Sequence, residues 1–171
     1  AQVSEQVTCH ISVLLGESVE ALNASSGGRY LDCTLGGAGH TKAILDASPE
    51  VEVVAIDRDV RAIGRAQTKL APYGARVGLH HHAFSELPAL VGREPFGAHS
   101  FHGMCADLGV STDQIREGRG FSFHDDASLD MRMNEEDGTT AEELVNTASE
   151  QELFVLLKEG GVGFEARAIA R

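Results

Sequence analysis

The chain has 171 residues, with 14 lysines and arginines against 26 aspartates and glutamates, which gives a formal net charge of −12. This length suits one domain, or one domain with the start of a second, and a hydrophobic content of 42% is typical of a folded globular protein. We expect no membrane span, because no apolar run approaches ~20 residues, and no signal peptide. The acidic balance argues against coating nucleic acid by charge alone, but it allows an enzyme that recognises one folded RNA site.

Neither the cysteines nor the histidines form a metal-binding pattern. Cys9, Cys33 and Cys105 lie far apart without a CxxC pair, so we expect reduced thiols in an intracellular compartment. The run at 80–82 is three histidines, but neighbouring residues on a strand point to opposite faces. No cysteine or aspartate spacing completes a ligand set, so we predict no metal site.

Strand and helix patterns alternate along the first two thirds of the chain. Such alternation indicates βαβ units in a largely parallel α/β sheet with helices on both faces. In chain order we expect a helix at 11–22, a strand at 29–34, a helix at 40–47, a strand at 51–57, a helix at 60–70, a strand at 76–79, a helix at 84–91 and a strand at 99–106.

From residue 139 onward the pattern is helical only. The segment TTAEE at 139–143 resembles a capped helix start, and SEQE at 149–152 is a second capping signal. Glycines at 160–161 end that helix, and a last helix begins near residue 163. The change of pattern falls near residues 108–115, and we divide the chain into a βα part at 1–110 and a helical part at 111–171.

A glycine-rich loop follows the first expected strand. The segment DCTLGGAGH at 32–40 contains glycines that allow a tight turn and the close approach of a ligand. Asp57 ends the next strand, where a carboxylate can accept both hydroxyls of a ribose. This order of strand, glycine loop, helix, strand and acid predicts a nucleoside-binding site. The alternative is a tight turn with a capping aspartate.

The loop sequence narrows the choice of cofactor. It lacks the GxGxxG order of dinucleotide folds and the GK[ST] end of a triphosphate-binding loop. Asp32 beside the loop repels phosphates but suits the ammonium of an amino-acid moiety. These features favour S-adenosylmethionine, which carries a ribose and a cationic centre but no phosphate.

Five segments resemble, in this order, the RsmH (MraW) family of S-adenosylmethionine-dependent methyltransferases, which act on cytosine N4 of small-subunit ribosomal RNA. They are DCTLGGAGH at 32–40, DRD at 57–59, DLGVS at 107–111, RGFSF at 119–123 and LDMRM at 129–133. The resemblance covers nearly all of residues 10–171. It implies a Rossmann-like methyltransferase sheet, with the first four strands and the cofactor site in 1–110. Residues 111–171 then correspond to the family's helical insertion subdomain, which faces RNA.

The resemblance also implies site residues. Besides Asp32, the implied cofactor contacts are loop residues, a carboxylate that binds the ribose, an aromatic ring near the adenine and two polar residues further along the chain. In that order they are Ala38, Gly39, His40, Asp57, Phe84, Asp107 and Gln114. Asp107 is the expected acceptor for the N4 protons of cytosine, whose delocalised amine is a poor nucleophile. The alternative is that Asp107 only contacts the cofactor or caps a helix.

Two further pairs of residues are candidates for holding the RNA. We take Arg119 and Arg132 as substrate-binding residues, because guanidinium planes stack on unpaired bases. The alternative for both is a salt bridge to Asp130. Phe121 and Phe123 we interpret as core aromatics of a folded loop.

The sequence departs from the family pattern in three ways. Ala38 stands where the family commonly has glycine, which the loop tolerates if its backbone there is not in a conformation reserved for glycine. The segment 99–106 is more polar than a usual buried parallel strand. The family's chains are longer, so we expect the strands that complete its sheet to be absent from this sequence.

The resulting prediction is an S-adenosylmethionine-dependent methyltransferase acting on cytosine N4 of small-subunit ribosomal RNA or of the assembled small subunit. We expect it in the cytoplasm or, alternatively, in a mitochondrial or plastid matrix, without a membrane partner. Two alternatives stay open: a methyltransferase with another substrate, and a non-catalytic module that binds cofactor or RNA without turnover. The sequence leaves open whether the chain forms a homodimer.

Overall fold

The computed structural model describes residues 12–97, 101–124, 126–136 and 138–171. The chain folds as two compact units, Ala1–Asp113 and Gln114–Arg171. Within the described ranges, no helix has the length and apolar character that crossing a membrane requires.

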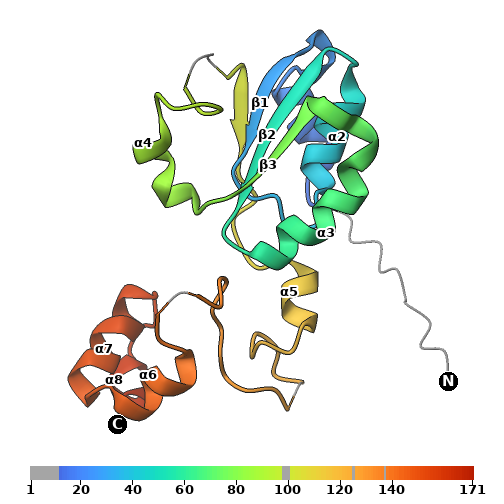
Figure 1. Ribbon diagram of the computed structural model, residues 1–171. Helices are drawn as coiled ribbons and strands as arrows, with labels where there is room; N and C mark the ends of the chain where they lie inside the picture. The colour runs from blue at the N-terminus through green and yellow to red at the C-terminus, as the bar shows by residue number, and fades with distance from the viewer. Residues whose placement is uncertain (1–11, 98–100, 125, 137) are drawn as a thin grey trace, which may run out of the picture. The chain divides into compact units, whose positions relative to one another are not determined.

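The first unit is built on a four-stranded parallel sheet. Its strands are β1 (Gly28–Asp32), β2 (Val51–Asp57), β3 (Val77–His81) and β4 (Gly103–Cys105), and they lie in the order β3-β2-β1-β4 (Figure 1). The helices of this unit are α1 (Leu15–Ala21), α2 (Gly39–Ala47), α3 (Val60–Leu70) and α4 (Leu87–Leu90), with the 3-10 turns η1 (Ala24–Ser26), η2 (Ala71–Arg76) and η3 (Phe84–Glu86). The expected α/β fold with a Rossmann-like parallel sheet is confirmed.

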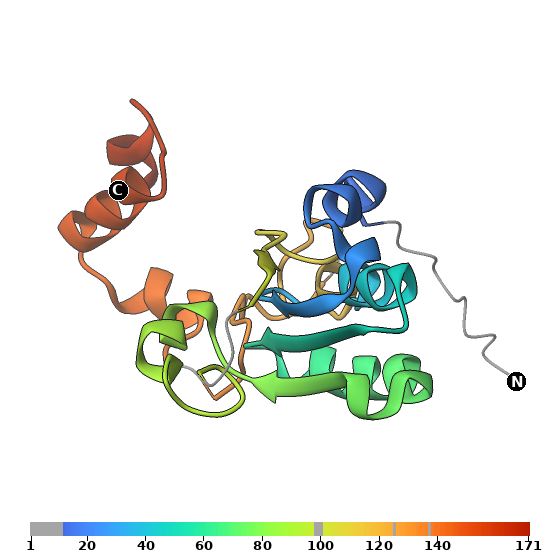
Figure 2. The same ribbon diagram turned by 90° about the horizontal axis from the view of Figure 1, so that it is seen from above.

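Each face of the sheet has its own apolar core, because successive strand residues point to opposite sides. On one face Tyr30 and Val53 pack with Ile44 of α2 and Ile63 of α3. The opposite face buries a smaller cluster, which Leu87 of α4 borders: Leu31, Cys33, Val54, Ile56 and Phe96. Figure 2 shows the strands with helices on both sides, and the two layers hold the carboxyl ends of the strands in fixed positions.

Four expected elements are shorter than their sequence patterns indicate, and one of them is the strand expected at 29–34, which ends at Asp32. The helix expected at 11–22 begins at Leu15, after Leu14 adopts a left-handed backbone with φ 52°. The helix expected at 84–91 divides into η3 and α4, because Pro88 has no amide hydrogen to continue a helix from Phe84. The fourth strand, expected at 99–106, covers only Gly103–Cys105, and residues 98–100 lie outside the described ranges.

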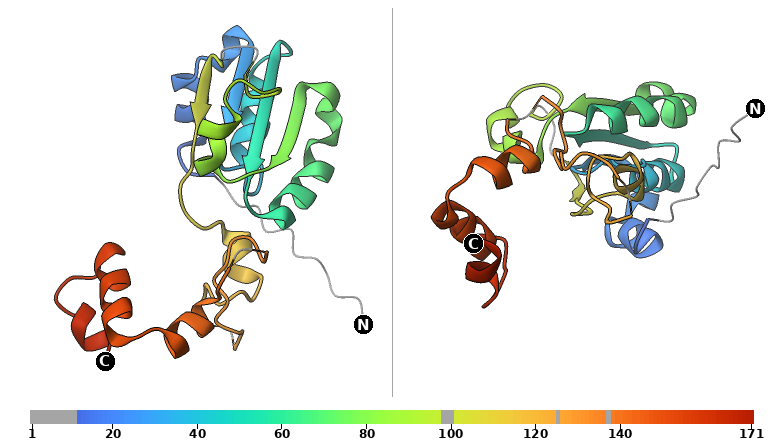
Figure 3. Two further views of the ribbon diagram at one scale, coloured as in Figure 1. Left: turned by 60° about the vertical axis from the view of Figure 1, so that its left-hand side comes forward. Right: turned by 90° about the horizontal axis from the view of Figure 1, so that it is seen from below.

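The second unit contains short helices, with α5 (Thr112–Arg116) crossing its boundary. They are α6 (Ala141–Thr147), α7 (Glu150–Glu159) and α8 (Ala166–Ile169), shown in orange and red in Figure 3. Capping boxes begin α6 at Thr140 and α7 at Ser149, each closed by a glutamate three residues later. The two capping signals in the sequence are therefore confirmed.

Candidate functional site

Three aspartates gather where the parallel strands end. Asp32 is the last residue of β1, Asp57 is the last residue of β2, and Asp107 follows β4 by two residues. The register places Asp32 opposite Ala55 on one side and Cys105 on the other. Because all pairs are parallel, the carboxyl ends meet at one edge of the sheet, which is where open α/β sheets bind ligands.

The Asp57 carboxylate ties the glycine loop to β2. Its Oδ2 accepts a hydrogen bond from the Gly36 amide at 2.8 Å, and its Oδ1 accepts one from the Asp59 amide at 2.9 Å. Burial raises the pKa of Asp57, and the two amide donors act in the opposite direction. Each carboxylate oxygen keeps a second lone pair, so Asp57 can still accept hydroxyl donors from a ligand.

Asp32 is buried, with 1% of its surface exposed. Its Oδ1 accepts a hydrogen bond from the Thr34 amide at 3.0 Å, and its Oδ2 accepts one from the Thr41 hydroxyl at 2.6 Å. Burial raises the pKa of Asp32 above its usual range, while these two donors lower it. In the structure Asp32 therefore joins the end of β1 to the first turn of α2, and its contact with a cofactor ammonium stays a prediction.

Ala38 and Gly39 form the tight part of the loop. Ala38 is fully buried and has a left-handed backbone with φ 60° and ψ 24°, which costs a non-glycine residue about 1–2 kcal/mol. The loop therefore carries strain where the family commonly has glycine. A Cβ on Gly39 would lie 2.0 Å from the Ser12 hydroxyl oxygen, so a larger residue there would displace the Ser12 side chain that packs against the loop.

His40 and Asp107 face one another beside this loop. His40 Nδ1 lies 3.9 Å from Asp107 Oδ2, and His40 Nε2 lies 3.2 Å from the Val13 carbonyl oxygen. The backbone of Asp107 is held as well, because its amide donates to the Thr34 hydroxyl at 2.7 Å. Thr34 and Thr41 are site residues that were not predicted, although both are hydroxyl residues that flank the glycine cluster.

The remaining predicted cofactor residues lie on other elements. Phe84 follows the carboxyl end of β3 at the start of η3, and its side chain is 50% exposed rather than packed in the core. Gln114 lies in α5 and is buried, but it belongs to the second unit. Its contact with a cofactor stays a prediction.

The donor set of the loop fits a nucleoside without phosphates. In phosphate-binding loops the backbone N–H groups point at the ligand. Here the Gly36 amide donates to Asp57, the Leu35 amide to the Ile56 carbonyl and the Ala38 amide to the Leu35 carbonyl. Lys69, the basic side chain beside the loop, donates to the Gly37 carbonyl oxygen. The carboxylates at this edge of the sheet suit hydroxyl and ammonium groups and repel phosphate.

The family comparison agrees with this geometry. Residues 7–171 match the model of the MraW methylase family. The chain belongs to this family of methyltransferases.

Relatives of known name are similar to nearly the whole chain. The chain is 45% identical to Ribosomal RNA small subunit methyltransferase H of Cyanothece sp., over 95% of this chain and 53% of that protein. It is 44% identical to the protein of the same name from Geobacter sp., over 94% and 52%. The chain therefore spans about half the length of these relatives.

Among solved structures, an rRNA methylase from Streptococcus thermophilus is similar in part. The match covers 51% of this chain and 52% of that protein, with a TM-score of 0.39 and 23% sequence identity.

In the second unit of this MraW-family chain, the two candidate RNA-binding arginines make internal ion pairs. Arg119 is 5% exposed, and its guanidinium lies 2.7 Å from Glu117 Oε2 and donates to the Met133 carbonyl at 3.0 Å. Arg132 binds both oxygens of Asp130, at 2.8 Å each, and this pair lowers the pKa of Asp130 to about 2. The salt bridge expected as the alternative is thus present for Arg132, and RNA binding by either arginine stays a prediction.

The two aromatic residues of this segment differ in exposure. Phe121 is half-buried beneath the Arg119 guanidinium, 5.9 Å from the centre of its ring. Phe123 is fully exposed, so its interpretation as a core aromatic is wrong. Exposure of this ring depends on how the loop folds, which the local sequence pattern does not determine.

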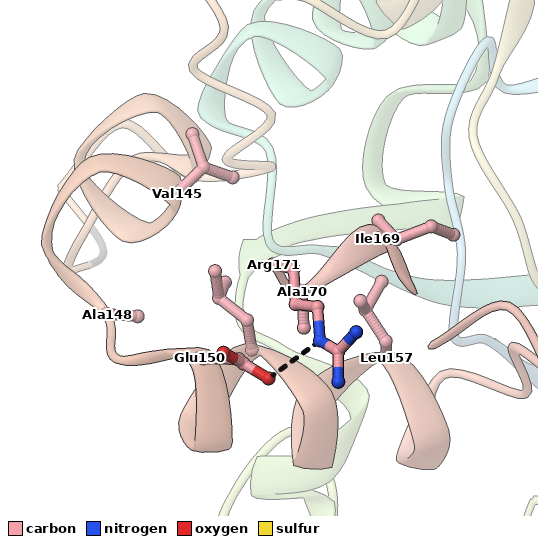
Figure 4. Close-up of a pocket in the computed structure, with 8 residues that line it drawn as sticks. Val145, Ala148, Glu150, Leu157, Ile169, Ala170 and Arg171 are labelled. Carbon is pink, nitrogen blue, oxygen red and sulfur yellow. Dashed lines mark ion pairs between the residues drawn. The ribbon is translucent and has the colours of Figure 1, made fainter. Parts of the chain in front are cut away.

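The second unit also holds a pocket between α6, α7 and α8, with a volume of about 440 Å³ (Figure 4). Most of its lining is apolar: Val145, Leu153, Leu157 and Ile169. Glu150 and Arg171, which also line it, form an ion pair of 3.5 Å. Within the described part of the chain, no group of three or more histidine, cysteine, aspartate or glutamate side chains is placed to hold a metal ion.

Proposed function

We propose that this chain is the cofactor-binding part of an S-adenosylmethionine-dependent methyltransferase that acts on cytosine N4 of small-subunit ribosomal RNA. The observation that carries the proposal is the glycine loop fastened to Asp57, with Asp32 and Asp107 at the same edge of the sheet. The relatives named ribosomal RNA small subunit methyltransferase H support the substrate class.

The binding roles follow from the positions of the side chains. Asp57 accepts the ribose hydroxyls, because its carboxylate keeps free lone pairs beyond the two amide bonds. The exposed ring of Phe84, beyond the end of β3, supplies a flat apolar surface for the adenine. Ala38, Gly39 and His40 bring the backbone of the loop close to the cofactor.

The chemistry requires an acceptor for a proton at the reacting amine. When bound, S-adenosylmethionine supplies a methyl group already activated on a sulfonium. Asp107 accepts an N4 proton at its carboxylate, since its side chain is 51% exposed and its backbone is held by Thr34. The target base has to leave its stack to reach this carboxylate.

Calorimetric titration of this chain with S-adenosylmethionine tests the binding site. We expect Asp57→Ala to weaken binding at least about tenfold, because hydrogen bonds to a charged group contribute ~1.5–3 kcal/mol. Glu52→Ala is the matched control, since Glu52 is an exposed carboxylate on the same strand. Circular dichroism verifies that each variant folds. A folded wild-type chain that fails to bind contradicts the proposal.

Methyl incorporation into small ribosomal subunits then tests the reaction. Radiolabelled S-adenosylmethionine identifies the modified base after digestion of the RNA, and N4-methylcytosine is the expected product. Cofactor binding without incorporation favours a non-catalytic binding module. Incorporation at another atom or into another acceptor favours a methyltransferase with a different substrate.

A further inference from the structure

The imidazole of His40 has a partner at each ring nitrogen, Val13 on one side and Asp107 on the other. His40 lies in the first turn of α2 and is 8% exposed. Its Nε2 is 3.2 Å from the carbonyl oxygen of Val13, which precedes α1. A carbonyl oxygen can only accept a hydrogen bond, so Nε2 carries the hydrogen. In the neutral ring, Nδ1 is then an unprotonated acceptor.

The Nδ1 atom faces the carboxylate that we propose as the proton acceptor. The distance from Nδ1 to Asp107 Oδ2 is 3.9 Å, longer than a direct hydrogen bond. The Asp107 side chain is 51% exposed and its backbone is held at Thr34, so a small rotation of the carboxylate closes this gap. Asp32 is a second carboxylate that interacts electrostatically with His40, but its oxygens are occupied by Thr34 and Thr41.

A proton that reaches this pair of acceptors can be shared between the nitrogen and the carboxylate. Two acceptors face each other across the gap, and a proton placed between them joins them in a charge-assisted hydrogen bond. The proton of this hydrogen bond can come from solvent or from the cytosine bound next to Asp107. The arrangement is thus suited to storing one proton next to the reacting amine.

We propose that His40 is a positioning residue that receives, at Nδ1, the proton that Asp107 takes from cytosine N4. This inference rests on the proposed function. In the reaction the N4 lone pair forms the new bond to the methyl carbon, and the electron pair of the broken carbon–sulfur bond stays on sulfur. The N4 proton passes to Asp107 and then to His40 Nδ1. The imidazolium and the Asp107 carboxylate then form an ion pair until the proton leaves to solvent.

Nitrogen-15 spectroscopy of the histidine rings tests this arrangement without requiring activity. A protonated ring nitrogen and an unprotonated one resonate far apart, and the His40→Gln spectrum assigns the His40 signals by their loss. We expect the neutral ring of the wild-type chain to carry its hydrogen on Nε2. A hydrogen on Nδ1 overturns the proposal, because His40 would then donate to Asp107 and could not receive its proton.

Two substitutions separate proton transfer from packing in the methyl-incorporation assay. His40→Gln keeps a donor close to the Nε2 position for the Val13 carbonyl but cannot receive a proton. We expect kcat to fall by about 10²-fold with KM for S-adenosylmethionine within about threefold. His40→Ala is expected to regain turnover when imidazole is added. Loss of cofactor binding in His40→Gln, or an unchanged kcat, overturns the proposal.

These experiments distinguish failure of the inference from failure of the proposed function. If the wild-type chain transfers no methyl group, the proposed activity fails, and the ring tautomer still decides whether Nδ1 is an acceptor. If the wild-type chain is active and His40→Gln is equally active, the proposed activity stands and the role of His40 is refuted.

Discussion

The hydrogen bond between Thr41 and Asp32 offers a direct test of how the glycine loop is held. Thr41 is completely buried, and its hydroxyl donates to Asp32 Oδ2 at 2.6 Å. Thr41→Val preserves the shape of the side chain but removes this donor. The Asp32 carboxyl keeps the Thr34 amide and loses a partner in a site that water does not reach.

The expected loss of stability follows from this geometry. A hydrogen bond to a charged group contributes about 1.5–3 kcal/mol, so the free energy of unfolding should fall by about that amount in Thr41→Val. Thr41→Ser is the matched control, because it keeps the hydroxyl and removes one buried methyl group, which costs about 1 kcal/mol. We therefore expect the free energy of unfolding to fall more in Thr41→Val than in Thr41→Ser.

The effect should also depend on pH. Burial raises the pKa of Asp32, and the Thr41 hydroxyl lowers it by stabilising the ionised form. Without Thr41 the native pKa rises further, so the native state of the variant retains its proton to higher pH than the wild type. A proton held more tightly in the native state makes stability fall as pH rises. The loss caused by Thr41→Val should thus be greater near pH ~8 than near pH ~4.

Urea unfolding followed by tyrosine fluorescence measures this loss in the first unit alone. The chain has two tyrosines and no tryptophan, and both Tyr30 and Tyr73 lie in that unit. The midpoint should shift while the slope stays constant. Equal stability of the wild type and Thr41→Val at both pH values would refute the idea that this hydrogen bond secures the loop.

Three further predictions concern the second unit. Asp130→Asn should have a lower free energy of unfolding than wild type at pH values above 3.8, the ordinary pKa of aspartate, because the ionised carboxylate stabilises the fold. This difference should vanish as pH falls through about 2, and circular dichroism during urea unfolding measures it. Ser149→Ala should cost about 0.5–2 kcal/mol in the same measurement, with Ser149→Thr close to wild type; equal values for both contradict the cap. Gly120→Ala places a Cβ 2.8 Å from the Ser128 carbonyl oxygen, so hydrogen exchange at the Met131 amide should accelerate, and unchanged protection would argue against the close packing.

Much of the fold could be predicted from local sequence patterns. The helix Val60–Leu70 and the strand Val51–Asp57 match their expected bounds, because each has an apolar periodicity that tertiary contacts do not override. Helix starts at Thr140 and Ser149 were also predictable, since a capping box needs only residues three positions apart. The fourth strand was predicted too long because His99–Ala106 has no such local signal beyond its mixed composition.

The candidate site was predictable in outline only. Alternation of strands and helices places Asp32, Asp57 and Asp107 at the carboxyl ends of parallel strands, and the segment order led to the MraW family. Hydrogen-bond partners of Asp57 and Asp107 come from distant positions in the sequence, so the sequence pattern does not predict them. Asp57 is bound by Gly36, and the Asp107 backbone by Thr34.

The sequence by itself thus determined the fold class, the order of most elements and the residue types at the edge of the sheet. Only the tertiary structure decided that Asp32 is buried and holds the loop, that Phe123 is exposed, and that the His40 ring lies between Val13 and Asp107. The physical reason is range: periodicity and caps depend on neighbours within a few residues. Burial and the direction of a hydrogen bond depend on residues brought together from distant parts of the chain.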